Sequence, residues 1–263
     1  MRPAAILCAA AVAALAPVSA AQAQAAAPDA THWSWRGAIA AGKTLEIKGI
    51  NGSVRAEAGT GSQVEVTAEK TARHDDPADV RIEVVEHEGN VTICAVYPGR
   101  GNACEPGDGG HMSVRDNDVQ VQFVARVPAG VAFHGRTVNG GVEAAGLTAN
   151  VDLSSVNGRV DIETTSGDAS GNTVNGSIRA VIRGQGREPL RFSTVNGSID
   201  VTLAGGLNAD FEAETVNGGI QSDFPVTLQG RINPRHLTGR IGQGGRSLRI
   251  STVNGGIRLH TAP

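Results

Sequence analysis

The chain has 263 residues, of which 40% are hydrophobic and 19% charged, with a formal net charge of −3. This balance is typical of a folded globular protein, and it excludes a disordered or collagen-like chain and a strongly basic nucleic-acid-binding protein. Glycine is frequent, at 35 residues, whereas aromatic residues make up only 3%. So few aromatic side chains disfavour a helical bundle, and we expect many turns and aliphatic side chains buried in thin layers.

Residues 1–25 have the pattern of a secretory signal peptide. Arg2 gives a positive start, residues 4–16 are an apolar run, and Ala-Gln-Ala at 21–23 is a small-residue cleavage site. A membrane anchor is the alternative, but the run is too short to span a bilayer. Cys8 lies inside the apolar run and far before the cleavage site, which argues against a lipoprotein. We therefore expect an exported protein, periplasmic or extracellular, with no transmembrane segment in the mature chain.

Residues 26–130 form an irregular region with short stretches of alternating apolar and polar side chains. The stretches at 64–68, 80–84 and 119–123 predict β-strands with one buried face. Val-Pro-Ala-Gly at 127–130 is typical of a short turn rather than a linker. We expect this N-terminal β region to continue directly into the segment that follows.

Two cysteines, Cys94 and Cys104, remain after removal of the signal peptide. The segment between them contains Gly, Pro and Asn and can turn the chain back on itself. Export favours oxidation, so the pair predicts a disulfide, worth about 2–3 kcal/mol for so short a loop in the chain-entropy model. Two cysteines without a second Cys or His pair do not make a zinc site.

Residues 131–263 contain six near-identical copies of a Thr-Val-Asn-Gly motif, one of them with Ser in place of Thr. The repeated asparagines are Asn139, Asn157, Asn175, Asn196, Asn217 and Asn254. The first five are spaced by 18, 18, 21 and 21 residues. Ile-Asn-Gly at 50–52 is an early outlier, and Leu-Thr-Gly-Arg-Ile at 237–241 is a degenerate copy before the last one.

Apolar and polar residues alternate on both sides of each Asn-Gly, which predicts strands with one buried face. Two all-β architectures fit this pattern. In a β-solenoid, a single-stranded parallel β-helix with coils of about 18–21 residues, the six asparagines would form a structural ladder along one corner. In an antiparallel meander or sandwich, each Asn-Gly would be a two-residue hairpin loop. We favour the solenoid, because a fixed coil length with a repeated corner residue is what stacking selects.

Ligand-binding patterns are weak. Asp116-Asn117-Asp118 offers oxygen ligands to Ca²⁺, but it lacks the rest of a calcium loop and is more typical of a turn. Trp33 and Trp35 face one side of a strand and could stack on a sugar, although capping the open end of the core is the favoured interpretation. We predict no catalytic, cofactor-binding or metal-binding residue, and no cofactor.

The C-terminal segment 224–263 contains six arginines and no acidic residue. This asymmetry predicts a basic end on the final coils. Arg246, Arg249 and Arg258 are the candidate contacts to an anionic envelope polymer, since Arg pairs well with phosphate and carboxylate. The alternative is that these side chains cover the edge of the solenoid.

The Thr-Val-Asn-Gly repeats, together with the ending Gly-Arg-Ile-Gly-Gln-Gly-Gly at 239–245 and Leu-Arg-Ile-Ser-Thr-Val-Asn-Gly at 248–255, carry a family likeness. They resemble the bacterial exported family of unknown function known as putative adhesins with β-strand repeats. That family is related to the head Gly-Ile-Asn domain of putative autotransporter adhesins. The resemblance covers most of the mature chain and implies a β-solenoid and an envelope or surface location. It implies no catalytic residue.

Three functions follow as hypotheses. The first is a non-catalytic, adhesin-like structural or interaction module of the envelope, whose partner is unknown: an anionic envelope glycan or another envelope protein, and no nucleic acid. The second is a polysaccharide-binding or polysaccharide-degrading β-helix, which needs clustered acids. Outward acids are present but do not recur at one coil position: Asp161, Glu163, Asp200, Glu212 and Glu214. The third is an accessory domain in envelope signalling.

Overall fold

The computed structural model describes residues 30–109, 112–165, 168–224, 227–228 and 235–262. The predicted signal peptide lies outside these residues. One short 3-10 helix, η1 (Pro77–Asp79), is capped by the Asp76 side chain, and the other regular elements of the described residues are strands. No helix in this part of the chain is long and apolar enough to cross a membrane.

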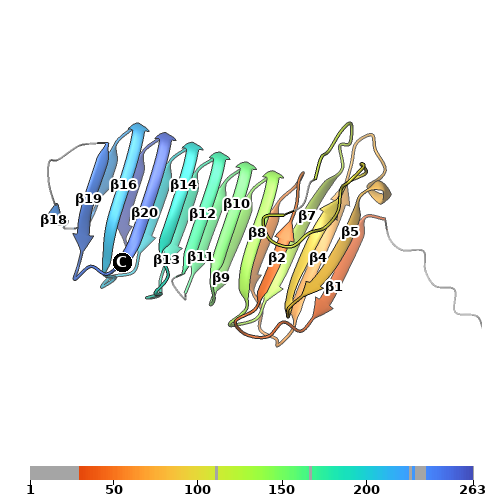
Figure 1. The fold of residues 1–263 in the computed structure, drawn as a ribbon, viewed down its shortest axis with the longest axis horizontal. Helices are drawn as coiled ribbons and strands as arrows, with labels where there is room; N and C mark the ends of the chain where they lie inside the picture. Colours follow the sequence, from red (N-terminus) through yellow and green to blue (C-terminus); the bar gives the residue numbers. More distant parts are fainter. Residues whose placement is uncertain (1–29, 110–111, 166–167, 225–226, 229–234, 263) are drawn as a thin grey trace, which may run out of the picture.

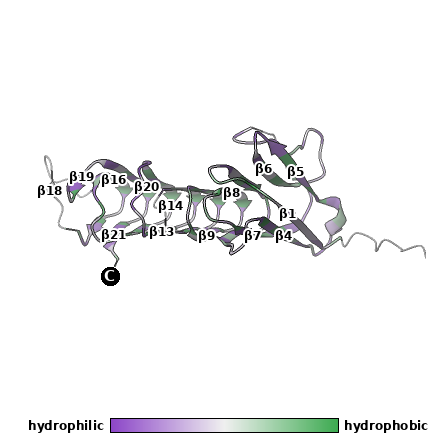
Figure 2. Ribbon diagram, turned by 90° about the horizontal axis from the view of Figure 1, so that it is seen from below, coloured by the Kyte–Doolittle hydropathy of each residue, from purple (hydrophilic) through white to green (hydrophobic). Residues whose placement is uncertain are grey.

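The strands form two sheets that lie as two layers of an elongated body (Figures 1 and 2). Sheet A has ten strands, in spatial order β1 (His32–Gly37), β4 (Val64–Thr71), β7 (Gln120–Val127), β3 (Val54–Ala58), β9 (Val142–Leu147), β11 (Val160–Thr164), β13 (Ile178–Ile182), β15 (Ile199–Leu203), β21 (Ile257–Thr261) and β17 (Ile220–Ser222). Sheet B has eleven strands, β18 (Thr227–Leu228), β19 (His236–Ile241), β16 (Ala209–Asn217), β20 (Arg246–Asn254), β14 (Leu190–Asn196), β12 (Ala169–Asn175), β10 (Val151–Asn157), β8 (Ala132–Asn139), β2 (Thr44–Lys48), β6 (Asn90–Val96) and β5 (Arg81–His87).

Each repeat is one coil of a solenoid, which confirms the β-solenoid prediction. A strand of sheet B runs to the repeated Asn, the chain turns at Asn-Gly, and the next strand lies in sheet A. Strands of successive coils pair in parallel, for example β10 with β12 and β11 with β13. The hairpin alternative is therefore wrong, because the two strands that flank an Asn-Gly belong to different sheets.

The coils are not stacked in chain order. The last repeat, β20 and β21, lies between the coil of β14 and β15 and the coil of β16 and β17. In Figure 1 the blue arrow of β20 stands between β16 and β14. The antiparallel strands β19 and β18 then continue sheet B beyond β16. The expectation of a basic end on the final coil is corrected by this order, since the final coil has a neighbouring coil on both sides.

The N-terminal end is arranged in a similar way. The first coil, β2 and β3, lies between β8 and β9 on one side and β6 and β7 on the other. Antiparallel partners then cover the outside: β5 pairs with β6, β4 with β7 and β1 with β4. The antiparallel strands β1 and β5 are thus the edge strands of the two sheets at this end.

The core is a thin layer of mostly aliphatic side chains between the two sheets. Within one coil, Leu190 and Phe192 from sheet B and Ile199, Val201 and Leu203 from sheet A are all buried. Trp33 and Trp35 on the edge strand β1 pack against this core and are partly buried. Alternation on both strands therefore places every second residue inside and leaves the others on two long outer faces.

Candidate functional site

The repeated asparagines form one continuous row along the corner of the solenoid. Each side-chain Nδ2 donates to the Oδ1 of the Asn one coil nearer the N-terminal end, over 2.7–2.9 Å, in the order Asn51, Asn139, Asn157, Asn175, Asn196, Asn254, Asn217. This uses one N–H and one lone pair of each inner amide. A second N–H and a second lone pair therefore remain on each exposed amide, repeated at every coil.

A second row, of buried hydroxyls, lies two residues before the asparagines. Each donates to the carbonyl oxygen of the corner glycine one coil away, at 2.9 Å in every case; the donors are Thr137, Ser155, Thr173, Thr194, Thr252 and Thr215. The motif thus contains its own hydrogen-bond partner for an inward polar side chain. This role was not predicted from the sequence, although the presence of only Thr or Ser at the position was a signal for it.

The corner glycines allow the coils to approach closely. A Cβ on Gly176 would lie 2.0 Å from the carbonyl oxygen of Gly158, and one on Gly197 would lie 2.0 Å from that of Gly176. Neither residue has a φ in the left-handed region. These positions therefore need glycine for lack of a side chain rather than for backbone freedom.

The repeated valines are exposed. The most exposed large apolar side chains among the described residues are seven valines, and six of them belong to the motif: Val138, Val156, Val174, Val195, Val253 and Val216, at 37–50% exposure. They form a column on the outer face of sheet B, next to the asparagines. We call this column together with the Asn row the Val–Asn strip.

The strip carries no charge over its middle. The next outward column, two residues before the valines, holds Ser154, Asn172, Ser193 and Ser251 on the four central coils. Charged residues stand in this column only at its two ends, Arg136 and Glu214. The column varies in residue type from coil to coil, whereas the valine does not.

The outer face of sheet A is different, because it carries ion pairs between neighbouring positions. Arg55 pairs with Glu143 at 3.5 Å and Arg258 with Asp200 at 3.1 Å, both between adjacent coils. Two further acids considered for a glycosidase site are paired on this face, Asp161 with Arg159 and Glu163 with Arg183, whereas Glu212 pairs with Arg249 on the outer face of sheet B.

The three arginines predicted to contact an anionic polymer lie beside acids. Arg246 is 6% exposed at its side chain and pairs with Asp168 at 2.9 Å, so it is a structural residue rather than a surface one. Arg249 and Arg258 are half-exposed or more, and each has a carboxylate partner on a neighbouring coil. Binding of an anionic polymer by these two stays a prediction.

The Cys94–Cys104 disulfide is confirmed, with 5.5 Å between the Cα atoms. It holds the segment 97–119 against the strands β2 and β6. Tyr97 closes the base of this segment: its hydroxyl donates to the carbonyl of Val119 at 2.7 Å. Burial raises the pKa of Tyr97 to about 12.

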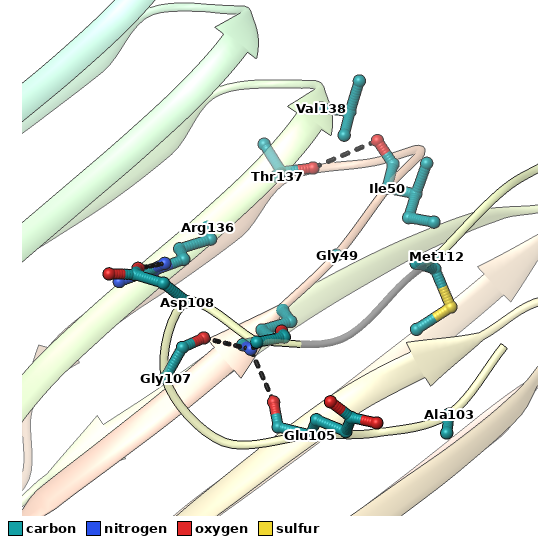
Figure 3. A pocket seen from close by; sticks show the side chains of 12 residues that line it. Gly49, Ile50, Ala103, Glu105, Gly107, Asp108, Met112, Arg136, Thr137 and Val138 are labelled. Carbon is teal, nitrogen blue, oxygen red and sulfur yellow. Dashed lines mark hydrogen bonds and ion pairs between the residues drawn. The ribbon is translucent and has the colours of Figure 1, made fainter.

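A cavity of about 180 Å³ lies where this segment meets the ends of β2 and β8 (Figure 3). Lys48 extends into the segment and donates to the carbonyls of Glu105, Gly107 and Gly109. Arg136 pairs with Asp108, and this hydrogen bond and charge lower the pKa of the Asp108 carboxyl. Both cations of the cavity are thus engaged by the protein itself, and they attach the segment to the solenoid.

Beneath the cavity, Glu46 is buried, at 4% exposure. One carboxylate oxygen accepts from the Thr92 hydroxyl at 3.0 Å and from the Gly107 N–H at 2.9 Å. The other lies 3.6 Å from Arg136 Nε and 3.9 Å from Lys48 Nζ. Glu46 therefore acts as the centre of a polar network that holds the 97–119 segment.

Asp118, one of the acids considered for Ca²⁺, instead accepts hydrogen bonds from the backbone of the turn at residues 73–75. The Asp118 carboxylate accepts from the backbone N–H groups of Arg73, His74 and Asp75 at 3.0–3.2 Å, and from the His74 ring. Desolvation acts to raise its pKa, but these hydrogen bonds outweigh it and lower the pKa of Asp118 to about 2. Among the described residues no group of three or more His, Cys, Asp or Glu could hold a metal ion.

The repeat region matches a known protein family. Residues 136–260 match the family model described as Toastrack DUF4097. This part of the chain is thus similar to Toastrack DUF4097 domains. The matched segment spans the coils from β8 to β21 and so includes the Val–Asn strip from Val138 onward. No curated protein matches the chain.

Two solved structures resemble the chain over most of its length. A putative cell adhesion protein from Clostridium sporogenes ATCC 15579 has a TM-score of 0.52 at 10% identity, covering 88% of this chain and all of its own. A putative adhesin from Bacteroides fragilis NCTC 9343 has a TM-score of 0.36 at 12% identity, covering 89% and 99%. The first likeness extends across the N-terminal region as well as the repeat region, and at this identity it concerns the fold.

Proposed function

We propose that the protein is a non-catalytic, exported interaction module of the bacterial envelope, with an adhesin-like architecture. The observation that carries the proposal is the Val–Asn strip, because its exposed residues are repeated although neither the core nor the turn requires an exposed valine. Four of the five outward acids considered for an enzyme, Asp161, Glu163, Asp200 and Glu212, are engaged in ion pairs with arginines of the same face. The name of the first structural relative, a putative cell adhesion protein, agrees with this proposal.

The test is direct binding to envelope material. The labelled full chain is incubated with isolated cell-wall sacculi, outer-membrane vesicles and released surface polysaccharide from the producing bacterium, and the bound fraction is measured after sedimentation or filtration. We expect saturable retention on at least one fraction, competed by unlabelled protein and lost after thermal unfolding. Absence of saturable retention on all three fractions would contradict the proposal.

A further inference from the structure

The Val–Asn strip has a shape that suits a linear ligand. Its six valines follow one another at the coil spacing of about 4.8 Å, so the column is about 24 Å long and one side chain wide. At 37–50% exposure the six side chains present a few hundred Å² of apolar surface. A stable protein–protein contact buries about 800 Å² on each partner, so a second copy of the chain would be poorly supported by this strip.

The chemistry of the strip is that of a neutral, hydroxyl-rich surface. At each coil the two methyl groups of a valine lie beside an asparagine amide, which has one N–H donor and one acceptor lone pair left after its bonds to the neighbouring asparagines. Sugar rings offer the matching set, with apolar C–H groups on the ring face and hydroxyls that donate and accept at its edge. On the four central coils neither the strip nor the column beside it has an ionisable side chain, so a charged polymer would gain no ion pair there.

The recurrence of valine in every copy of the motif indicates that the strip has more than a structural role. A β-branched residue suits an outward strand position, and stacked valines support each other across strands. The adjacent outward column tolerates Ser, Asn, Arg and Glu at the same depth, however, so pairing between strands does not by itself demand valine. The hydrogen bonds between asparagines fix the amides in one orientation, which lowers the ordering cost of binding.

From these observations we infer that the Val–Asn strip is a binding site for an uncharged polysaccharide chain, which lies along the long axis of the solenoid with one sugar unit per coil. The inference rests on the proposed function and names the class of ligand that the envelope module takes.

The probes are neutral oligosaccharide series of increasing length, namely cello-, chito-, malto- and laminari-oligosaccharides, with polygalacturonate as the charged comparison. Binding to the full chain is followed by calorimetry at low and high salt. We expect one neutral series to bind, with an affinity that rises with length until the oligomer spans the strip, about 24 Å, and then levels off. The affinity should not change with salt, since no charge is involved.

Variants locate the site. Val174→Asp with Val195→Asp places two charges at the centre of the strip, and we expect binding to weaken by about tenfold or more. Val174→Thr with Val195→Thr keeps the shape and strand preference and should weaken it by a few-fold, which covers the case in which the Asp variant is unstable. Val124→Asp is the matched control: this valine is 37% exposed on the other outer face, in sheet A, and its substitution should leave binding unchanged.

Three results would overturn the inference: no binding to any neutral series, salt-sensitive binding to polygalacturonate alone, or equal binding by the strip variants and the wild-type chain. If the chain still sediments with envelope fractions in that event, the proposed function stands and only the ligand class or the site is wrong. Retention that is lost when the envelope fraction is treated with protease would point to a protein partner instead.

Discussion

Substitution of a corner glycine tests how the coils are held together. In Gly176→Ala the new Cβ would lie 2.0 Å from the carbonyl oxygen of Gly158 and 2.6 Å from its carbon. Real Cβ contacts are essentially never shorter than 3.0 Å, so the neighbouring coil must move by at least 3.0 − 2.0 = 1.0 Å. The obstacle is backbone, which cannot rotate out of the way as a side chain can.

That displacement acts on contacts that the two coils share. The Gly158 carbonyl accepts from the Thr173 hydroxyl at 2.9 Å, and Asn175 Nδ2 donates to Asn157 Oδ1 at 2.8 Å. Overpacking a tight site usually costs about 1–3 kcal/mol, and strained hydrogen bonds add to it. We therefore expect Gly176→Ala to lower the free energy of unfolding by about 3 kcal/mol or more, measured by urea denaturation.

Gly219→Ala is the matched control, in the residue that follows the corner glycine of another copy. A Cβ there meets nothing within 4 Å, and the equivalent positions hold Arg159 and Ser177. Its free energy of unfolding should stay within about 0.5 kcal/mol of the wild-type value. A Gly176→Ala protein as stable as the control would refute the close-approach argument, and equal losses in both would show that backbone flexibility is what matters.

Three further measurements test the disulfide-held segment and the ion pair of the inserted coil. The pKa of Tyr97 is about 12 in the folded protein and 10.0 in the unfolded chain, so the free energy of unfolding should not depend on this group below pH 10 and should fall by about 1.4 kcal/mol per pH unit between pH 10 and pH 12. Tyr97→Phe should abolish this fall. Tyrosinate absorbance reports the ionisation directly, because the chain has a single tyrosine. Cys94 and Cys104 should react with thiol reagents only after reduction, and replacing both by Ala should cost about 2–3 kcal/mol in a denaturation curve; free thiols in unreduced, denatured protein would contradict the bridge. Arg246→Met should destabilise the protein by about 3 kcal/mol, because it leaves the partly buried Asp168 carboxylate without its arginine partner. Adding Asp168→Asn should restore part of this loss. A double variant that is no more stable than Arg246→Met alone would argue against the ion pair.

Much of the coil could be predicted from the sequence because each copy repeats the same local information. The alternation around Asn157 or Asn175 determines which residues face inward, and the Asn-Gly pair marks the corner. Two details were beyond the pattern. The first is the reason for glycine at the corner, which is the close contact of Gly176 or Gly197 with the backbone of the next coil. The exposed valine was indistinguishable from an ordinary strand residue until the outer face of sheet B was seen as a whole.

The order of the coils could not be predicted, for a related reason. All copies present the same inward pattern and the same corner, so any coil can stack on any other with similar core contacts. What distinguishes the actual order is polar and lies outside the motif. Arg258 reaches Asp200 on the coil of β15, and Arg246 reaches Asp168 before β12 as well as the carbonyl of Glu188 before β14. The 37-residue interval between Asn217 and Asn254 was the visible sign that the chain leaves the simple succession there.

These arginines show where the acid-free C-terminal segment finds carboxylate partners. A repeat whose core face is interchangeable needs some other contact to select its neighbours, and ion pairs are suited to this because a wrong neighbour leaves a charge unpaired. The last coil supplies Arg246, Arg249 and Arg258. Its adjacent coils supply Glu212 and Asp200, and Asp168 lies one coil further away, before β12. Three of the six arginines of this segment thus lie in the inserted coil, where they meet acids that come from other parts of the chain.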